Sequence, residues 1–376
     1  ASGNISGVTT LTISNAGGTT TLSGDVDVTT LAVGNTVANL AFTGNGSTVT
    51  NDIDFANDGT LTLGASGGTQ TYNGGLDTSG VGSTVTLNGT IATSNDAVTF
   101  GAVTLGSATT IDTNASNTTG DIAIGAVTGG SNNLTLTTGD NVANSDITAS
   151  GAISGLGNLT LADVGGTATF SANVAAAALS ADSTVANLVF TGASNTFSAA
   201  STLANDGTLQ FGDATGDSFT FNGGLTTSDV GGTVTLNTSI STSNDALVFG
   251  AITLGNNITL DTNATNTTGD LTIGAVTGGS NTLTLTTENN IANADITASG
   301  NISGVTTLTL TSVGGTATFA GDVDVTTLAV GNTVANVAIN GNGSTITNDI
   351  DFANDGTLQL GDATGAVSYT HLRAHE

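Results

Sequence analysis

Aspartate pairs are the residues of this chain whose type and spacing come closest to chemistry. Asp25 and Asp27 form one pair and Asp52 and Asp54 form another, each with a single residue between its members. On a β-strand, alternation places both members of a pair on the same face, about 7 Å apart. Two carboxylates at a short distance are the acid and base of glycoside hydrolysis. The pairs therefore raise the hypothesis of a carbohydrate-active enzyme.

The remaining residue types argue against catalysis. Residues 1–366 contain no Lys, Arg, His, Cys or Trp, because both histidines and the single base, Arg373, lie beyond them. A hydrolytic triad needs a histidine, a proton shuttle usually does, and an acidic sugar needs a cation. A solvated acidic face explains the pairs without catalysis. We therefore expect a protein that is not an enzyme.

Acidic corners suggest a second kind of site. Asp and Asn supply the oxygen ligands that Ca²⁺ prefers. However, the sequence lacks both the Gly-Gly-x-Gly-x-Asp repeat of calcium-binding β-rolls and the EF-hand pattern. Asn and Asp at corners also bond to their own backbone. We predict no metal site and no cofactor, and calcium remains the alternative. The candidate calcium ligands are Asp52, Asp54, Asp58, Asp213, Asp217, Asp349 and Asp351.

Charge limits the partners of the chain. Its 376 residues carry 29 acids and one base, a formal net charge of −28. Such a surface repels nucleic acid and anionic membranes, since phosphate binding depends on Lys and Arg. No apolar run approaches the roughly 18 residues of a membrane helix. We expect a secreted chain with no nucleic-acid partner and no membrane insertion.

A long internal repeat organises the sequence. Asn57-Asp58-Gly59 returns at Asn205 and at Asn354, which gives repeats 1–148, 149–297 and a partial third, 298–366. Residues 1–61 match 298–358 at 50 of 61 positions, and many differences exchange one apolar residue for another. Near-exact repetition is typical of an array that grows by stacking.

Within each repeat, short alternating segments predict strands separated by Gly- and Asn-rich corners. The predicted strands are 10–13, 30–33, 40–42, 60–63, 84–87, 98–100, 121–124, 133–136 and 158–161. Their spacing predicts a parallel β-helix, or β-solenoid, of about 21 residues per rung. Right-handedness follows from the crossover rule for parallel strands. We expect Leu11, Ile13, Val26, Leu31, Leu40 and Phe42 in its core.

Two other interpretations of the pattern are weaker. A string of antiparallel sandwich domains would need linkers and usually prolines, but the chain has no proline and no linker between repeats. Threonine rows such as Thr9-Thr-Leu-Thr12 suggest ice binding, although rung lengths vary too much for a flat lattice. We therefore expect residues 1–366 to form a single continuous solenoid.

The last ten residues, 367–376, break the repeat. They resemble the translated adapter read-through of assembled sequence data, so we predict a non-native tail that adds no rung. A genuine boundary to another domain is the alternative.

The phrases Thr-Leu-Thr-Leu, Gly-Gly-Thr-Ala-Thr-Phe and Asn-Asp-Gly-Thr-Leu resemble the β-strand repeats of large bacterial surface proteins. These include autotransporter passengers, haemagglutinin-like adhesins and surface-layer-type proteins. The resemblance implies export to the cell surface and a non-enzymatic structural or adhesive role. It also implies partners among surface glycans, surface proteins or other surface subunits. The enzyme and a calcium-binding surface-layer repeat remain the alternatives.

Overall fold

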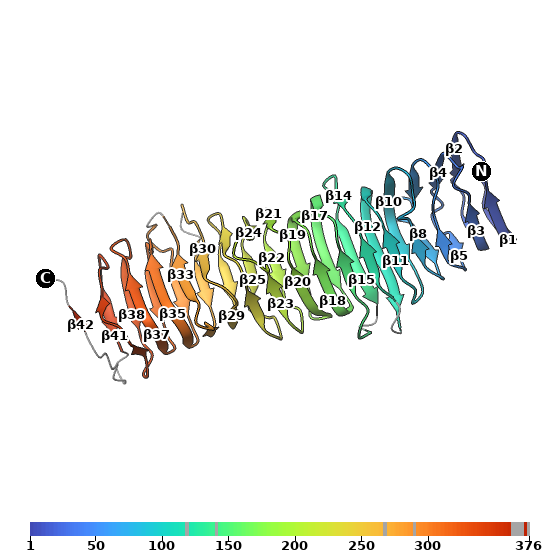
Figure 1. The fold of residues 1–376 in the computed structure, drawn as a ribbon. Helices are drawn as coiled ribbons and strands as arrows, with labels where there is room; N and C mark the ends of the chain where they lie inside the picture. The colour runs from blue at the N-terminus through green and yellow to red at the C-terminus, as the bar shows by residue number, and fades with distance from the viewer. Residues whose placement is uncertain (117–119, 140–141, 266–268, 289–290, 362–371, 374–376) are drawn as a thin grey trace. The chain divides into compact units, whose positions relative to one another are not determined.

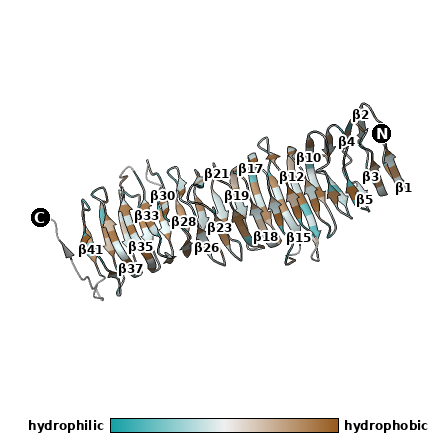
Figure 2. Cartoon of the chain, in the orientation of Figure 1, coloured by the Kyte–Doolittle hydropathy of each residue, from teal (hydrophilic) through white to brown (hydrophobic). Residues whose placement is uncertain are grey.

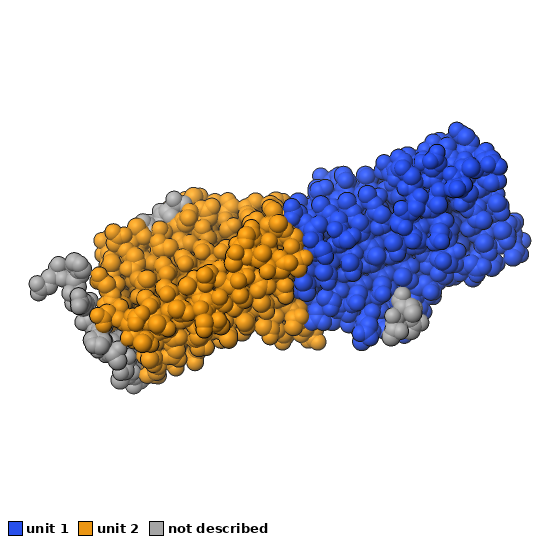
Figure 3. All heavy atoms as spheres, in the orientation of Figure 1, with its two compact units in different colours: residues 1–189 blue, residues 190–376 orange. Residues whose placement is uncertain are grey.

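The computed structural model describes residues 1–116, 120–139, 142–265, 269–288 and 291–361, together with the backbone of 372–373. The chain divides into two compact units, Ala1–Val189 and Phe190–Glu376 (Figure 3). In each unit, short strands pair in parallel with strands of the neighbouring coils (Figure 1). No helix occurs in these described ranges. Each unit is therefore an all-β parallel β-solenoid, which confirms the predicted fold class.

The strands of the first unit are β1 (Ile5–Ile13), β2 (Thr19–Leu22), β3 (Val26–Val33), β4 (Asn39–Phe42), β5 (Thr48–Val49), β6 (Ile53–Asp54), β7 (Leu61–Leu63), β8 (Thr69–Tyr72), β9 (Leu76–Asp77), β10 (Val85–Ala92), β11 (Val98–Phe100), β12 (Val103–Ala115), β13 (Ile122–Ile124), β14 (Val127–Thr128), β15 (Leu134–Gly139), β16 (Ile147–Ala149), β17 (Ile153–Ala162), β18 (Val164–Phe170) and β19 (Val174–Ala181). Strand β20 (Val185–Phe190) runs over the division between the units.

The strands of the second unit are β21 (Ser194–Phe197), β22 (Ser201–Leu203), β23 (Leu209–Phe211), β24 (Ser218–Phe221), β25 (Leu225–Thr227), β26 (Val234–Leu236), β27 (Ile240–Thr242), β28 (Leu247–Phe249), β29 (Ile252–Leu254), β30 (Ile258–Asp261), β31 (Leu271–Ile273), β32 (Val276–Thr277), β33 (Thr282–Thr286), β34 (Ile296–Ala298), β35 (Ile302–Thr311), β36 (Thr316–Phe319), β37 (Val323–Val330), β38 (Asn336–Ile339), β39 (Thr345–Ile346), β40 (Ile350–Asp351), β41 (Leu358–Leu360) and β42 (Leu372–Arg373).

Coil length varies around the predicted value. Hydrogen bonds between neighbouring coils join residues 21 apart at Asp25 and 25 apart at Asp121. The longer coils include Gly-rich corners, as at Gly130 and Ser131, whose φ angles are +58° and +67°. Left-handed backbone of this kind is easy for glycine and turns the chain sharply. Extra residues thus collect in such corners.

Apolar side chains stack in columns down the inside of each unit. Because side chains alternate along a strand, every second residue points inward and meets its counterpart in the next coil. Brown apolar bands recur along the strands of Figure 2. One column of the first unit contains Leu40, Leu61, Val85, Val103, Val127, Ile153 and Val174. One column of the second contains Leu225, Leu247, Leu271, Ile296, Ala317 and Val337.

Five of the six predicted core residues are buried, and the prediction is wrong for Leu11. Among the described residues, β1 pairs only with β3, so one side of Leu11 is uncovered and the side chain is half-buried. Its copy Leu308 lies between β33 and β37 and is fully buried. The inward direction of Leu11 follows from alternation, but its burial depends on the coil stacked before it.

The two units fill a pair of core positions with different chemistry. In the first unit, the fully buried Tyr72 hydroxyl donates to Gln70 Oε1 at 2.9 Å, and Gln70 Nε2 donates to the carbonyl oxygen of Phe42 at 2.8 Å. The second repeat carries Phe219 and Phe221 in these two places. Both phenylalanines are buried, with ring centroids 6.5 Å apart. An apolar pair thus replaces a polar pair that satisfies itself internally.

Three predictions about the ends and continuity of the fold stay predictions. Leu372 and Arg373 pair in parallel with Ile350 and Asp351 in a separate two-stranded sheet. The rest of the predicted tail, 367–371 and 374–376, lies outside the described residues. The continuity of residues 1–366 across the two units is untested, and so is the right-handed sense of the coil.

Candidate functional site

The first aspartate pair is engaged with backbone of the following coil. The backbone N–H of Gly46 donates to Asp25 Oδ1 at 2.8 Å, and the N–H of Thr48 donates to Asp27 Oδ1 at 3.1 Å. Hydrogen bonds to a carboxylate are about twice as strong as neutral ones. The pair therefore stabilises the stacking of coils.

The same carboxylate-to-amide contact recurs along both units. In the first, the Asp146 N–H donates to Asp121 Oδ1 at 2.9 Å, and the Thr167 N–H donates to Asp146 Oδ1 at 2.7 Å. In the second unit, the Asp295 N–H donates to Asp270 Oδ1 at 3.0 Å, and the Thr316 N–H donates to Asp295 Oδ1 at 2.7 Å. Asparagines do likewise, since Asn39 Oδ1 accepts the Thr60 N–H at 2.9 Å. Many acidic side chains thus satisfy donors that the ladder leaves open.

The second pair lies in a small acidic group. Asp54 of β6 is in register with Asp77 of β9. Burial raises the pKa of the Asp52 carboxyl, and the neighbouring carboxylates of Asp54, Asp77 and Asp96 raise it further, whereas a backbone hydrogen bond from Ile53 lowers it. A carboxyl with a raised pKa can act as a general acid. The neighbouring carboxylates could accept a proton, but no Lys, Arg or His within residues 1–116 could stabilise developing negative charge beside them.

The candidate calcium ligands do not gather into one site. Asp217 Oδ2 accepts the N–H groups of Asp213 and Ala214 at 2.9 and 3.0 Å, which closes a turn. Asp58, Asp349 and Asp351 lie on exposed stretches of two different coil regions. Within the described ranges, no three Asp, Glu, His or Cys side chains are placed to hold a metal ion together. Calcium binding stays an untested alternative.

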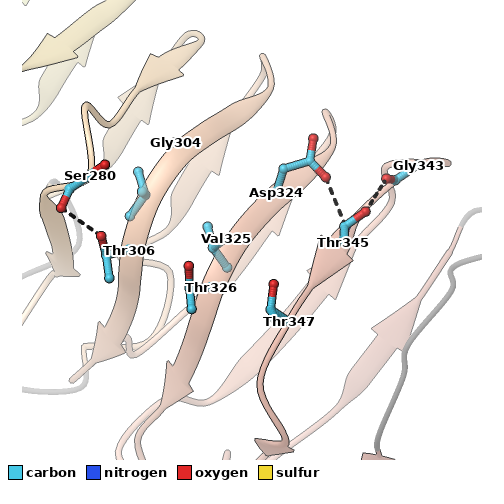
Figure 4. Close-up of a pocket in the computed structure, with 10 residues that line it drawn as sticks. Ser280, Gly304, Thr306, Asp324, Val325, Thr326, Gly343, Thr345 and Thr347 are labelled. Atoms are coloured by element: carbon cyan, nitrogen blue, oxygen red, sulfur yellow. Dashed lines mark hydrogen bonds between the residues drawn. The ribbon is translucent and has the colours of Figure 1, made fainter.

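A groove that the sequence analysis missed lies on the outer surface of β35, β37 and β39. It has a volume of about 500 Å³ and is lined by threonine hydroxyls, Gly304, Gly343, Val305, Val325 and Asp324 (Figure 4). The register of β35 against β37 shifts between Ser303 and Val305, next to Gly304 with its φ of +66°. A β-bulge of this kind bends a strand. We call this feature the Gly304 groove.

The first unit contains a second copy of it. The Gly7 groove, of about 420 Å³, is lined by Gly7, Val8, Thr9, Asp27, Val28, Thr29, Thr48 and Thr50, each 297 residues before its counterpart. Gly7 has a φ of +71°, and the register of β1 against β3 shifts between Ile5 and Val8. A glycine inside a strand pattern is the signal that could have pointed to these grooves.

The middle repeat keeps the bend and loses part of the polar lining, although Thr196 and Ser198 stand in the places of Thr48 and Thr50. Gly155 has a φ of +63°, and the register of β17 against β19 shifts between Ile153 and Leu156. The aspartate of the groove is Ala175 here, and the threonine two residues later is Ala177. The bend therefore forms without the carboxylate and the hydroxyl.

No protein-family model, curated protein or solved structure matches this chain. A search of the described residues finds no helix long and apolar enough to cross a membrane.

Proposed function

We propose that this chain is a non-enzymatic structural or adhesive segment of an extracellular bacterial surface protein. The observation that carries the proposal is the recurrence of one outer surface. The Gly7 and Gly304 grooves have the same residues at every compared lining position, although they belong to different repeats. A catalytic centre is a single constellation, whereas an array that binds or spaces presents the same face several times.

The use of the carboxylates supports the same proposal. Asp25, Asp27, Asp121 and Asp146 accept backbone N–H groups of the next coil, so they contribute to stacking. Stacked coils of this kind suit a shaft, because each coil is held mainly by its two neighbours. The proposed location is the bacterial cell surface. The proposed partners are glycans or proteins of a host or neighbouring cell, or other surface subunits.

Two measurements test the proposal. Antibodies raised against the purified chain should label intact cells of the producing bacterium, and protease added to those cells should remove the label. The purified chain should also leave soluble polysaccharides at full length over a long incubation. Label that appears only after the cells are permeabilised would overturn the surface location.

Turnover would favour the enzyme instead. The informative variant is Asp52→Asn with Asp54→Asn, because these side chains include the carboxyl with the raised pKa. If the parent chain releases reducing ends from a polysaccharide and this double variant does not, the function is hydrolytic and the structural proposal is wrong. Asp206→Ala is a suitable control, since its side chain is exposed and lies in the other unit.

A further inference from the structure

The Gly304 groove presents two rows of polar side chains that run from coil to coil. Along β37, Val325 is buried, so its neighbours Asp324 and Thr326 point to the outer face. Asp324 is in register with Thr345 of the next coil, and Val325 with the buried Ile346. Thr347 follows on the outer side, below Thr326 in the view of Figure 4. One row therefore contains Asp324 and Thr345, and the other contains Thr306, Thr326 and Thr347.

Several groups of these rows retain hydrogen-bonding capacity. The Thr345 N–H donates to Asp324 Oδ1 at 3.0 Å, which leaves the second carboxylate oxygen without a donor among the described contacts. The hydroxyls of Thr326 and Thr347 also have no partner among those contacts. Thr306 donates to the carbonyl of Ser280 at 2.7 Å and can still accept. The groove thus offers one strong acceptor and several hydroxyls that donate and accept.

The lining excludes two classes of ligand. It contains no Lys, Arg or His, so an anionic ligand would meet only Asp324 and a strongly negative chain. It contains no aromatic ring for stacking, and the floor residues Val305 and Val325 are 2% and 4% exposed. Apolar side chains of a ligand would therefore find little surface to cover.

The strands beneath the groove also disfavour an extended peptide. Peptides that add to a sheet need an unpaired edge. Here β35 pairs with β32 on one side and with β37 on the other, and β37 pairs onward with β39. The carbonyl of Gly304 accepts the Ser280 N–H at 2.7 Å, and the Thr306 N–H donates to the carbonyl of Asn281 at 2.9 Å. The backbone of the floor is already engaged. Recognition must come from hydroxyls and the carboxylate, which suits a ligand that is itself rich in hydroxyl groups.

We propose that the Gly304 and Gly7 grooves bind a neutral, hydroxyl-rich polysaccharide. Asp324 accepts hydrogen bonds from sugar hydroxyls, and Thr326 and Thr347 bond to hydroxyls along the same chain of sugars. Asp27, Thr29 and Thr50 occupy the same positions in the Gly7 groove. There Val8 is 41% exposed and β1 pairs with β3 alone among the described residues, so the exclusion of apolar and peptide ligands rests on the Gly304 groove. The inference rests on the adhesive form of the proposed function and assigns it a ligand class and two sites.

The middle repeat supplies the variants that test it. Asp324→Ala with Thr326→Ala gives the groove the residues that the middle repeat has at Ala175 and Ala177. The bend at Gly155 forms with those alanines, so the variant should keep its fold. Asp27→Ala with Thr29→Ala does the same for the other groove. Thr202→Ala with Asp206→Ala is the matched control, because both side chains are exposed and lie outside the grooves. The far-ultraviolet circular dichroism of each variant verifies its fold.

Isothermal titration of the full chain with dextran, mannan and a soluble linear β-1,4-glucan is the experiment. At least one of the three should bind saturably, with two sites per chain. Each groove variant should remove one site or weaken it by at least about tenfold, since hydrogen bonds to a charged group are typically worth that much. The control variant should bind like the parent chain.

Three results would overturn the proposal: no binding of any of the three polysaccharides, binding that survives both groove variants together, or binding at the grooves of oligolysine alone. The last result would assign the grooves to a cationic peptide. None of these results changes the antibody labelling of intact cells, so the proposed function can hold even if the ligand assigned to the grooves is wrong. Conversely, label found only inside permeabilised cells would overturn the proposed function whatever the titration gives.

Discussion

β1 and β35 begin with the same eight residues, yet the two strands are buried to different extents. Val8 of β1 is 41% exposed, whereas its copy Val305 is 2% exposed. The two strands differ in whether a preceding coil covers them. β35 receives β33 from the preceding coil and β37 from the following one, while β1 pairs with β3 alone among the described residues. The direction of each side chain therefore follows from the sequence, whereas its burial depends on the neighbouring coil.

The first two repeats differ in another way. Gln70 and Tyr72 in one repeat correspond to Phe219 and Phe221 in the other. A buried polar group without a partner costs stability, so a change at one of the two positions favours a change at the other. Copies of one repeat can thus share a fold while their cores differ in chemistry.

The largest expected effect tests the contrast between β1 and β35. Leu308→Ala should cost about 2–5 kcal/mol of local stability, because it empties a position packed from both sides. Leu11→Ala should cost about 1 kcal/mol, since Leu11 is only half-buried and buries less apolar area. Hydrogen exchange of the amides in each strand measures the two losses separately. Equal losses of stability in the two variants would show that the preceding coil does not account for the difference between β1 and β35.

A double-mutant cycle tests the exchange of core chemistry. Gln70→Phe alone should cost about 1–3 kcal/mol, because it leaves the Tyr72 hydroxyl buried without an acceptor. Adding Tyr72→Phe should recover much of that loss, since the pair then matches the second repeat. Urea denaturation of the parent, both single variants and the double variant gives the coupling free energy. Strictly additive effects would show that the two positions are independent.

A smaller effect sharpens the first comparison. Asp25 and Asp322 each accept an N–H of the following coil, from Gly46 at 2.8 Å and from Gly343 at 2.7 Å. Asp25 and Asp322 lie just before β3 and β37, and each has a following coil, so Asp25→Ala and Asp322→Ala should each cost about 1–2 kcal/mol. Hydrogen exchange at Gly46 and Gly343 follows the loss. A much smaller cost at Asp25 would show that the two copies differ on more than one side.

The smallest effect depends on pH. Burial raises the pKa of the Asp261 carboxyl, and the Glu288 carboxylate raises it further. A carboxyl with a raised folded-state pKa contributes stability below its unfolded pKa and loses it as pH rises through the folded value. Glu288 has a φ of +49°, and the first repeat has Gly139 in its place. Glu288→Gly should therefore raise the thermal midpoint at pH 7 and raise it less at pH 3.

Glu288→Gln separates charge from backbone strain in that prediction. It keeps the left-handed conformation and removes the carboxylate, so it should reproduce only the part of the gain that depends on pH. An unchanged pH profile in both variants would mean that burial alone perturbs Asp261.

Local pattern predicted part of the strands with apolar alternation and missed others, among them β2, β8 and the 13-residue β12. Each of the nine predicted ranges overlaps a strand, from β1 and β3 to β15 and β17. The two-residue strands β5 and β6 were not predicted, because two residues are too few to show a period. The grooves escaped for a different reason. Gly7 and Gly304 are single glycines in a Gly-rich sequence, and only the stacked coils show that the strand register shifts beside them.

The sequence by itself determined the parallel coil, its period and the inward residues, because alternation and repeat spacing are local properties of the chain. It also excluded histidine- and lysine-based chemistry from residues 1–366. Only the tertiary structure decided that Asp25 and Asp27 bond to the next coil, that Leu11 is half-buried, and that Asp324 faces a groove. These outcomes depend on which residues of neighbouring coils meet, and stacking brings together groups about 21 residues apart.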